Sequence, residues 1–215
     1  MHRKSFIISF EGIEGSGKST CASLLFNFLK KNLNNLPKKF KNVFLFREPG
    51  STALGENLRN LLLNFLTPNI HKKTMAFLFE ASRSYLFEEN KEIFLENNII
   101  IFDRFIDSTI AYQGYGLGLD INFLEKLNLF ATDKIEPDLT FLLDVDIKVS
   151  LERIKSKKKD NIENMSIEFF KKVRHGFLEI AKKKSKRIIV IDGNRELKKV
   201  FENIKNLTLQ KIKKI

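Results

Sequence analysis

The stretch from Ser5 to Ser19, SFIISFEGIEGSGKS, decides the expected fold, because it joins a short apolar run to a glycine-rich loop. Gly12 to Ser19 matches the pattern G-x-x-x-x-G-K-[ST], whose glycines let successive backbone N–H groups point at a phosphate. The apolar run predicts a strand, and the apolar spacing from Ser19 to Lys31 predicts a helix. Strand, loop and helix in this order are the context that a phosphate-binding loop requires.

Further apolar runs predict four more strands, at residues 43–46, 99–102, 139–145 and 187–191. Helices are expected between and after them, at residues 53–66, 71–97, 123–132, 148–156, 166–184 and 196–213. Strands that are apolar throughout and separated by helix-length segments are typical of a parallel sheet covered on both faces. We therefore predict an α/β fold, a three-layer, doubly wound five-stranded parallel sheet in one domain over residues 1–215. Ligands should bind beyond the carboxyl ends of the strands.

Composition narrows the class of protein. The 215 residues are 43% hydrophobic, with 21 Phe, which argues against global disorder. No apolar run approaches the roughly 20 residues that cross a bilayer, and the first strand begins too near Met1 for a signal peptide, so we expect a cytoplasmic protein. The single cysteine, Cys21, excludes an internal disulfide and is expected to be buried. The net charge of +12 comes with lysines scattered along the chain and without an aromatic stacking platform between them, so no nucleic-acid partner is expected.

Three residue types around the phosphate loop carry the expected chemistry. Lys18 should bridge the β- and γ-phosphates of a nucleoside triphosphate, and the Ser19 hydroxyl should bind Mg²⁺. Asp103 follows the third predicted strand, where an acidic residue holds Mg²⁺ directly or through water; its alternative role is a helix N-cap. Asp144, also at a strand end, is a weaker metal candidate that we interpret as structural.

A phosphate loop indicates a nucleotide but not a reaction, and other segments narrow the choice. Four segments occur in order along the chain, namely Phe10–Thr20, Arg47–Thr52, Phe79–Arg83 and Asp103–Gly114. Together they resemble the thymidylate kinase family, and the resemblance extends to Ile189–Gly193 at the last strand. It implies a P-loop nucleoside monophosphate kinase fold, phosphorylation of dTMP to dTDP, ATP as phosphoryl donor, Mg²⁺ and a homodimer.

The resemblance also implies residue roles. Arg104 would hold the acceptor phosphate, with Arg47 near it, and Glu14 would face the sugar 3′-hydroxyl or a metal; with Lys18 these form the expected catalytic set. ATP would be bound by Gly12, Ile13, Glu14, Gly15, Ser16, Gly17, Lys18, Ser19 and Thr20, with Arg153 against the adenine. The dTMP site would comprise Phe79, Arg83, Arg104, Ser108, Thr109, Tyr112 and Gln113.

Within that site, Phe79 and Arg83 share a helix face at i, i+4, so the ring can stack on thymine while the guanidinium reaches a base carbonyl. Thr109 would offer a polar group to the base edge, and Tyr112 would disfavour a 2′-hydroxyl. Three alternatives stay open: Phe79 as an ordinary core aromatic, Glu14 as a solvated loop charge, and Arg47 in a surface ion pair with Glu48.

The chain departs from the family pattern at two places. Many bacterial relatives carry Asp-Arg-Ile-Glu where this chain has Asp160-Asn161-Ile162-Glu163, so an arginine is missing from the mobile lid expected at about residues 153–165. Lysines 155, 157, 158 and 159 are candidates to supply its charge. Ser51 stands where glycine is usual.

Two rival functions follow from the same residues. One is a P-loop kinase for another nucleoside monophosphate or a nucleoside. The other is a P-loop ATPase that binds nucleic acid, which the charge of +12 would suit. Arg47, Arg83 and Arg104 on the acceptor side argue against the ATPase.

Overall fold

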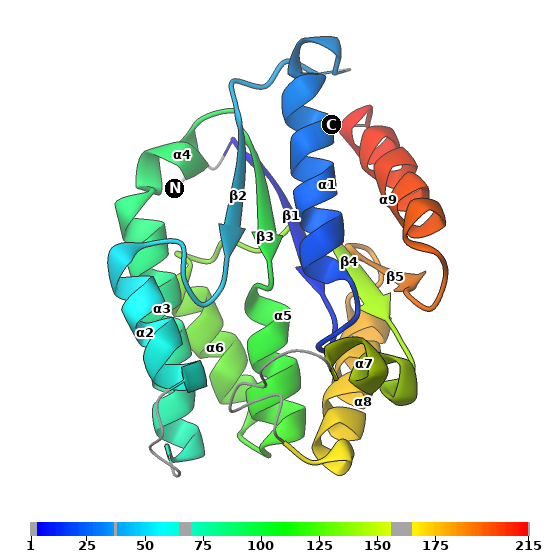
Figure 1. Ribbon diagram of the computed structural model, residues 1–215. Helices are drawn as coiled ribbons and strands as arrows, with labels where there is room; N and C mark the ends of the chain where they lie inside the picture. The colour runs from blue at the N-terminus through cyan, green and yellow to red at the C-terminus, as the bar shows by residue number, and fades with distance from the viewer. Residues whose placement is uncertain (1–3, 37, 65–69, 156–164, 215) are drawn as a thin grey trace.

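The computed structural model describes residues 4–36, 38–64, 70–155 and 165–214, and its centre is a five-stranded sheet (Figure 1). The strands are β1 (Phe6–Glu11), β2 (Val43–Arg47), β3 (Ile99–Asp103), β4 (Leu139–Asp144) and β5 (Ile188–Asp192). They are all parallel and lie in the order β2-β3-β1-β4-β5. Each predicted strand is present within one residue of its expected bounds, and the predicted parallel α/β sheet is confirmed.

Helices cover both faces of this sheet. The helical segments are α1 (Lys18–Lys31), η1 (Leu33–Asn35), α2 (Ala53–Asn64), α3 (Lys72–Glu89), α4 (Lys91–Leu95), α5 (Ile106–Thr109), η2 (Ile110–Gly116), α6 (Ile121–Ala131), α7 (Ile147–Ile154), α8 (Ile167–Lys183) and α9 (Leu197–Ile212). Alternate residues of β1 divide between the faces: Phe6, Ile8 and Phe10 pack with α1 and α9, whereas Ile7 packs with α3 and Phe105. Cys21 is fully buried in the first of these layers, as predicted.

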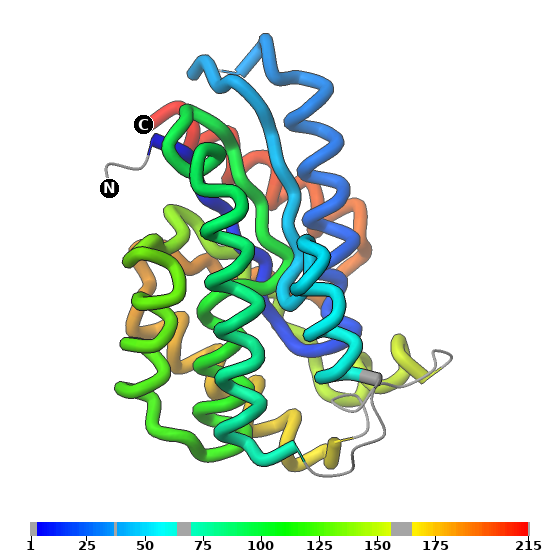
Figure 2. Tube along the Cα trace, turned by 90° about the vertical axis from the view of Figure 1, so that its left-hand side faces the viewer, coloured from blue at the N-terminus to red at the C-terminus, as the bar shows by residue number. Residues whose placement is uncertain are grey.

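The register of the sheet brings the expected functional segments to one edge. Phe10 lies beside Asp103, and Arg47 lies on the other side of Asp103, so the carboxyl ends of β1, β2 and β3 are adjacent. β1 begins and α9 ends at the opposite end of the molecule (Figures 1 and 2). Side chains that follow these three strands are therefore directed to a common region.

One helical prediction is wrong in detail, and one helical segment was missed. The expected helix at 71–97 is divided into α3 and α4 at Asn90, whose backbone N–H and side-chain Nδ2 both donate to Leu86 O, at 3.2 and 2.9 Å. Asparagine favours such local bonds over continued helix. The helical segment formed by α5 and η2 was not predicted, because it is short and contains glycine. The second part, η2, is π-helical, a form often found at functional sites.

Several sequence predictions fall in segments that the structure leaves undescribed. The lid prediction at about residues 153–165 lies mostly outside the described residues, together with lysines 157, 158 and 159 and with Asp160 to Glu163. Lys155 is described and follows α7. None of the helices in the described part of the chain has the length and apolar character needed to span a membrane.

Candidate active site

The phosphate loop connects β1 to α1 at the carboxyl edge of the sheet. Gly12 and Gly15 have φ angles of +142° and +70°, in the region that favours glycine. A Cβ at Gly12 would lie 2.6 Å from Leu143 O, and one at Gly15 would lie 2.6 Å from Ser150 O, so both positions require glycine for space as well. At the start of α1, the N-cap Gly17 has no side chain to satisfy the first helical N–H groups. These groups and the helix dipole form an anion site.

Lys18 points from the first turn of α1 into the space enclosed by the loop. It is only 7% exposed, and its Nζ donates to Ile13 O at 3.2 Å. Burial, followed by the nearby charge of Arg104, lowers the pKa of Lys18 to about 8. An ammonium group that is buried with one backbone acceptor among the described residues is poorly satisfied. A phosphate anion would supply the missing oxygen acceptors.

Asp103 ends β3 next to the phosphate loop, and its surroundings fit a cation. Its Oδ1 is buried and has no hydrogen-bond partner in the described part of the protein. Asp103 and Ser19 line the same cavity. The alternative role for Asp103 is wrong, because the N-cap of α5 is Phe105. Among the described residues no three His, Cys, Asp or Glu side chains form a metal site, so a cation here would depend on phosphate oxygens as further ligands.

Asp144, the weaker metal candidate, has a structural partner. Its two carboxylate oxygens accept from Nε and Nη2 of Arg174, at 2.6 and 2.9 Å. This bidentate pair joins the end of β4 to α8. The structural interpretation of Asp144 is confirmed.

Two cavities meet at the phosphate loop. The larger, about 490 Å³, contains all the predicted dTMP-site residues, namely Phe79, Arg83, Arg104, Ser108, Thr109, Tyr112 and Gln113, together with Glu14 and Arg47. The smaller, about 370 Å³, is lined by Gly15 to Thr20 and by Arg153, whose Nη1 donates to Gly15 O and Gly193 O at 3.2 and 3.0 Å. Gly15, Lys18 and Ser19 line both. Gly12 and Ile13 line neither, although Ile13 O binds Lys18.

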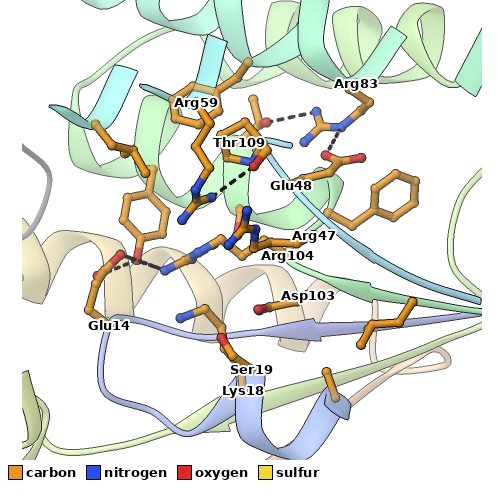
Figure 3. Close-up of a pocket in the computed structure, with 18 of the residues that line it drawn as sticks. Glu14, Lys18, Ser19, Arg47, Glu48, Arg59, Arg83, Asp103, Arg104 and Thr109 are labelled. Carbon is orange, nitrogen blue, oxygen red and sulfur yellow. Dashed lines mark hydrogen bonds and ion pairs between the residues drawn. The ribbon is translucent and has the colours of Figure 1, made fainter. Parts of the chain in front are cut away.

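Arg104 lies directly above the phosphate loop (Figure 3). Its Nη1 donates to Gly12 O at 3.1 Å and to Ser108 Oγ at 3.2 Å. Its Nη2 donates to Glu14 Oε1 at 2.7 Å and to Tyr112 Oη at 3.1 Å. Burial raises the pKa of Tyr112 well above its usual value, so its hydroxyl stays protonated and donates to Glu14. Glu14 is therefore a partner of Arg104 and Tyr112, and the reading of Glu14 as a solvated loop charge is wrong.

Arg83 is the centre of a buried network. It is 2% exposed, and its Nε donates to Glu48 Oε2 at 2.6 Å. Its Nη1 donates to Glu80, to Thr109 Oγ1 at 3.0 Å and to Asn128 Oδ1 at 2.5 Å. Thr109 Oγ1 in turn donates to Glu80 Oε1 at 3.0 Å, so the hydroxyl expected at the base edge is already bonded. Among the described residues, none accepts a hydrogen bond from Arg83 Nη2.

Arg47 has a different partner from the one considered in the sequence. Its Nη2 donates to both carboxylate oxygens of Glu56 on α2, at 2.9 and 3.0 Å. Glu48 instead is 4% exposed and binds Arg83, so the alternative of an Arg47–Glu48 surface pair is wrong. Arg47 remains half exposed at the cavity wall.

Sequence reasoning missed Arg59, Glu80 and Asn128. Arg59, on α2, lines the larger cavity, and its Nη1 donates to Pro49 O at 3.0 Å. The guanidinium groups of Arg47, Arg59 and Arg104 gather above Lys18 and Asp103 (Figure 3). The available signal was a basic residue near the middle of the helix that follows Arg47–Thr52. Glu80 and Asn128 give no such signal, because their role depends on the tertiary position of Arg83.

Comparisons with known proteins identify the family. The family model described as thymidylate kinase matches residues 10–204. A thymidylate kinase of Thermosipho melanesiensis is 45% identical over 201 residues, which are 93% of this chain and 96% of that protein. One of Wolbachia pipientis is 43% identical over 212 residues, covering 96% and 97% of the two chains.

A solved structure agrees as well. The crystal structure of thymidylate kinase from Ehrlichia chaffeensis superposes with a TM-score of 0.72 at 39% identity, covering 94% of this chain and 98% of that chain. The family, the nucleoside monophosphate kinase fold and the enzyme class expected from the sequence are thereby confirmed. This chain belongs to the thymidylate kinase family.

Proposed function

We propose that this chain transfers the γ-phosphoryl group of ATP directly to dTMP, giving ADP and dTDP for dTTP synthesis. The observation that carries the proposal is the meeting of the two cavities at Lys18 and Ser19. The smaller cavity, with Arg153 at its wall, suits the donor nucleotide, and the larger suits the acceptor. A donor and an acceptor bound on opposite sides of Lys18 have their phosphates adjacent.

Phosphoryl transfer depends mainly on positioning and charge neutralisation. The loop N–H groups and Lys18 bind the triphosphate, and Arg104 orients the acceptor phosphate with Arg47 and Arg59 nearby. An oxygen of the acceptor phosphate forms a bond to the γ-phosphorus as the bond to the β–γ bridging oxygen breaks. That oxygen is already a competent nucleophile, so no strong general base is needed.

Mg²⁺ is the proposed cofactor, held by Ser19 and Asp103, where it would neutralise charge on the donor phosphates. The unpaired buried Oδ1 of Asp103 supports this assignment. Glu14 is proposed to face the sugar 3′-hydroxyl. Its hydrogen bonds with Tyr112 and Arg104 hold its carboxylate in place for that role. Lys155 and the lysines that follow it are proposed to supply the charge of the missing lid arginine.

Selectivity for thymine is proposed to come from Phe79 and Arg83. Both line the acceptor cavity, as their i, i+4 spacing predicts. Phe79 is partly exposed there and can stack on the base, and Arg83 Nη2 can donate to a base carbonyl. Because the guanidinium is fixed by Glu48, Glu80 and Asn128, its donor direction is set before the base binds.

A homodimer is proposed from the family and from exposed aromatic side chains on α3 and α6. Phe77, Phe123 and Phe130 are 53%, 50% and 84% exposed. The ring centroids of Phe77 and Phe123 lie 6.4 Å apart, in an edge-to-face arrangement. Exposed rings on adjacent helices suit a self-complementary interface. Phe130→Glu should shift the chain toward monomer in light scattering; an unchanged mass would contradict this interface.

The cytoplasmic location expected from the sequence also stays a prediction.

The direct test is an assay that couples ADP formation to NADH oxidation, with ATP and Mg²⁺ and a panel of acceptors. The panel is dTMP, dUMP, UMP, CMP, AMP and thymidine. We expect the highest kcat/KM for dTMP. A preference for a ribonucleotide or a nucleoside would favour a different kinase activity. ATP hydrolysis that requires polynucleotide would favour the ATPase alternative.

A further inference from the structure

The carboxyl group of Glu11 is buried beside the site but has no part in the proposed transfer. Glu11 is the last residue of β1, immediately before the phosphate loop, and is 1% exposed. A buried carboxyl group is costly unless its oxygens are hydrogen-bonded. Its two partners, Phe105 and Ser108, lie at the N-cap of α5 and within α5, just after Arg104.

Both oxygens of Glu11 accept hydrogen bonds from these partners. Oε1 accepts from Phe105 N at 2.8 Å, and Oε2 accepts from Ser108 Oγ at 2.5 Å. More than 90 residues of sequence separate these partners from Glu11. The carboxyl group thus connects the strand before the phosphate loop to the segment after β3.

The backbone of Arg104 needs such support. Its φ is +68°, in the left-handed region, which costs a residue with a Cβ roughly 1–2 kcal/mol. A residue keeps such a strained backbone conformation when the interactions around it fix its position. Arg104 N donates to Phe10 O at 3.0 Å, and the next N–H, of Phe105, donates to Glu11. Two successive residues of β1 therefore hold the two N–H groups that flank the Arg104 side chain.

The side chain of Arg104 is held through Ser108. Ser108 Oγ donates to Glu11 and accepts from Arg104 Nη1 at 3.2 Å. A hydroxyl group has one proton, so its donation to Glu11 leaves the oxygen lone pairs for the guanidinium. Glu11 therefore sets the position of Arg104 by a backbone path and by a side-chain path.

The charges around Glu11 do not change this conclusion. Burial, and then the charge of Asp107, raises the pKa of Glu11 to about 8. Asp107 is itself paired with Arg187, at 2.7 and 2.8 Å. When Glu11 is protonated, its other oxygen still accepts from Phe105 and its hydroxyl can donate to Ser108. Both contacts exist in either form, so hydrogen bonding rather than charge does the positioning.

We propose that Glu11 is a positioning residue that holds Arg104 in the orientation required by the acceptor phosphate. The inference rests on the proposed role of Arg104 in binding dTMP. It adds to that role a residue from the donor side of the site. Because Glu11 adjoins Gly12, the strand that carries the phosphate loop also aligns the acceptor.

The test compares Glu11→Ala with Glu11→Gln in steady-state assays with dTMP and ATP varied separately. Glu11→Ala should raise the KM for dTMP about 10- to 100-fold, the scale of a misplaced binding group, and leave the KM for ATP nearly unchanged. Glu11→Gln should restore most of the loss, because its amide can accept from Phe105 and donate to Ser108. Ser9→Ala is the matched control: Ser9 is buried in the same strand but bonds Thr140, so its loss should not affect the KM for dTMP.

The outcomes distinguish a failure of the Glu11 proposal from a failure of the proposed dTMP kinase activity. An active wild type with an unchanged dTMP KM in Glu11→Ala overturns the inference alone, and so does an equal rise in Ser9→Ala. A wild type that does not phosphorylate dTMP contradicts the proposed function as well. If Glu11→Ala fails to fold, Glu11→Asp decides, because its shorter carboxylate keeps the charge but cannot reach both partners. A dTMP KM equal to wild type in Glu11→Asp then overturns the inference.

Discussion

The donor and acceptor sides of the site are built differently. The proposed phosphate-binding part of the donor side is one continuous segment, Gly15 to Thr20, which would bind mainly through backbone N–H groups of a loop and a helix end. The acceptor side is made of side chains from β2, α2, α3, η2 and the end of β3, most of them already paired with one another. A backbone site is therefore specified locally, whereas a side-chain site depends on tertiary pairing.

The acceptor side itself contains two kinds of arginine. The Arg83 side chain is 3% exposed and shared by two buried carboxylates, whereas the Arg47 side chain is 48% exposed and pairs with one. Removing one member of a buried ion pair is far more damaging than removing one from the surface. Arg83 should therefore be needed for folding as well as for binding, and Arg47 for binding alone.

The largest effect is expected from a substitution that breaks the buried network around Arg83. Arg83→Leu should lower the free energy of unfolding by about 3–5 kcal/mol, because Glu48 and Glu80 lose their common counterion. Arg47→Ala, the exposed counterpart, should cost less than about 1 kcal/mol. Urea unfolding of both variants measures the difference. Equal losses would contradict the distinction between the two arginines.

On the donor side, Lys18→Ala should lower kcat about 100- to 1000-fold, since it removes a preorganised cation from the transferring phosphates. The fold should be retained, because Nζ bonds only Ile13 O among the described residues. Turnover and circular dichroism check the two halves of this prediction. Near-normal turnover would remove Lys18 from the mechanism.

For the acceptor side, Arg104→Ala should raise the KM for dTMP about 100-fold, through loss of a charged phosphate contact. Binding of ATP should be preserved, because the loop N–H groups and Lys18 stay in place. Calorimetric titrations with dTMP and with a non-hydrolysable ATP analogue test both parts. An unchanged dTMP affinity would contradict the role of Arg104 in binding the acceptor phosphate.

Buried carboxyl groups of the two sides should also shape stability against pH. Burial raises the pKa of Glu48 to about 7, although Arg83 lowers it, and burial with Asp107 raises that of Glu11 to about 8; both groups normally ionise near 4.5. The unfolded chain releases these protons first. The stability that these two groups contribute is thus fullest below pH 4.5 and is lost as the pH rises toward 7 and 8.

The free energy of unfolding should consequently fall by roughly 5 kcal/mol between about pH 5 and about pH 7.5 if both groups titrate at these pKa values. Urea unfolding at a series of pH values measures the slope. Glu48→Gln should flatten it, because that site no longer titrates. A stability that stays level or rises over this range would contradict the raised pKa values of Glu48 and Glu11.

The smallest effect concerns Ser51, where the family usually has glycine. Its φ of +65° is strained, but its Oγ accepts from Arg47 N at 2.7 Å and donates to Arg47 O at 3.1 Å. Ser51→Gly should relieve the strain and lose these bonds, for a net change in stability below about 1 kcal/mol. Thermal melting checks it. A larger gain in stability would mean that the relief of backbone strain dominates, and a larger loss would mean that the hydrogen bonds of Ser51 dominate.

The difference between the two sides also explains what the sequence could predict. The phosphate loop, Asp103 and the five parallel strands follow from local pattern and from topology. The acceptor residues could be assembled only by resemblance, because they come from distant segments. Their partners could not be predicted: nothing near Arg47 indicates that it binds Glu56 while its neighbour Glu48 turns inward to Arg83.

Glu11 was missed for a related reason. In sequence it is a charged residue at the end of an apolar strand. Its partners Phe105 and Ser108 lie at the N-cap of α5 and within α5, a helix that periodicity did not reveal. The division of the expected helix at Asn90 was likewise hidden, because the apolar pattern continues beyond it. Local pattern identified the elements, and the pairings between them required coordinates.

A crystal structure of the chain with a non-hydrolysable ATP analogue, Mg²⁺ and dTMP tests the central claim most directly. Our account predicts the triphosphate within the N–H groups of the phosphate loop, and the dTMP phosphate at Arg104, next to the terminal phosphate of the analogue across Lys18. Two nucleotides bound in a closed complex with their phosphates far apart would contradict it.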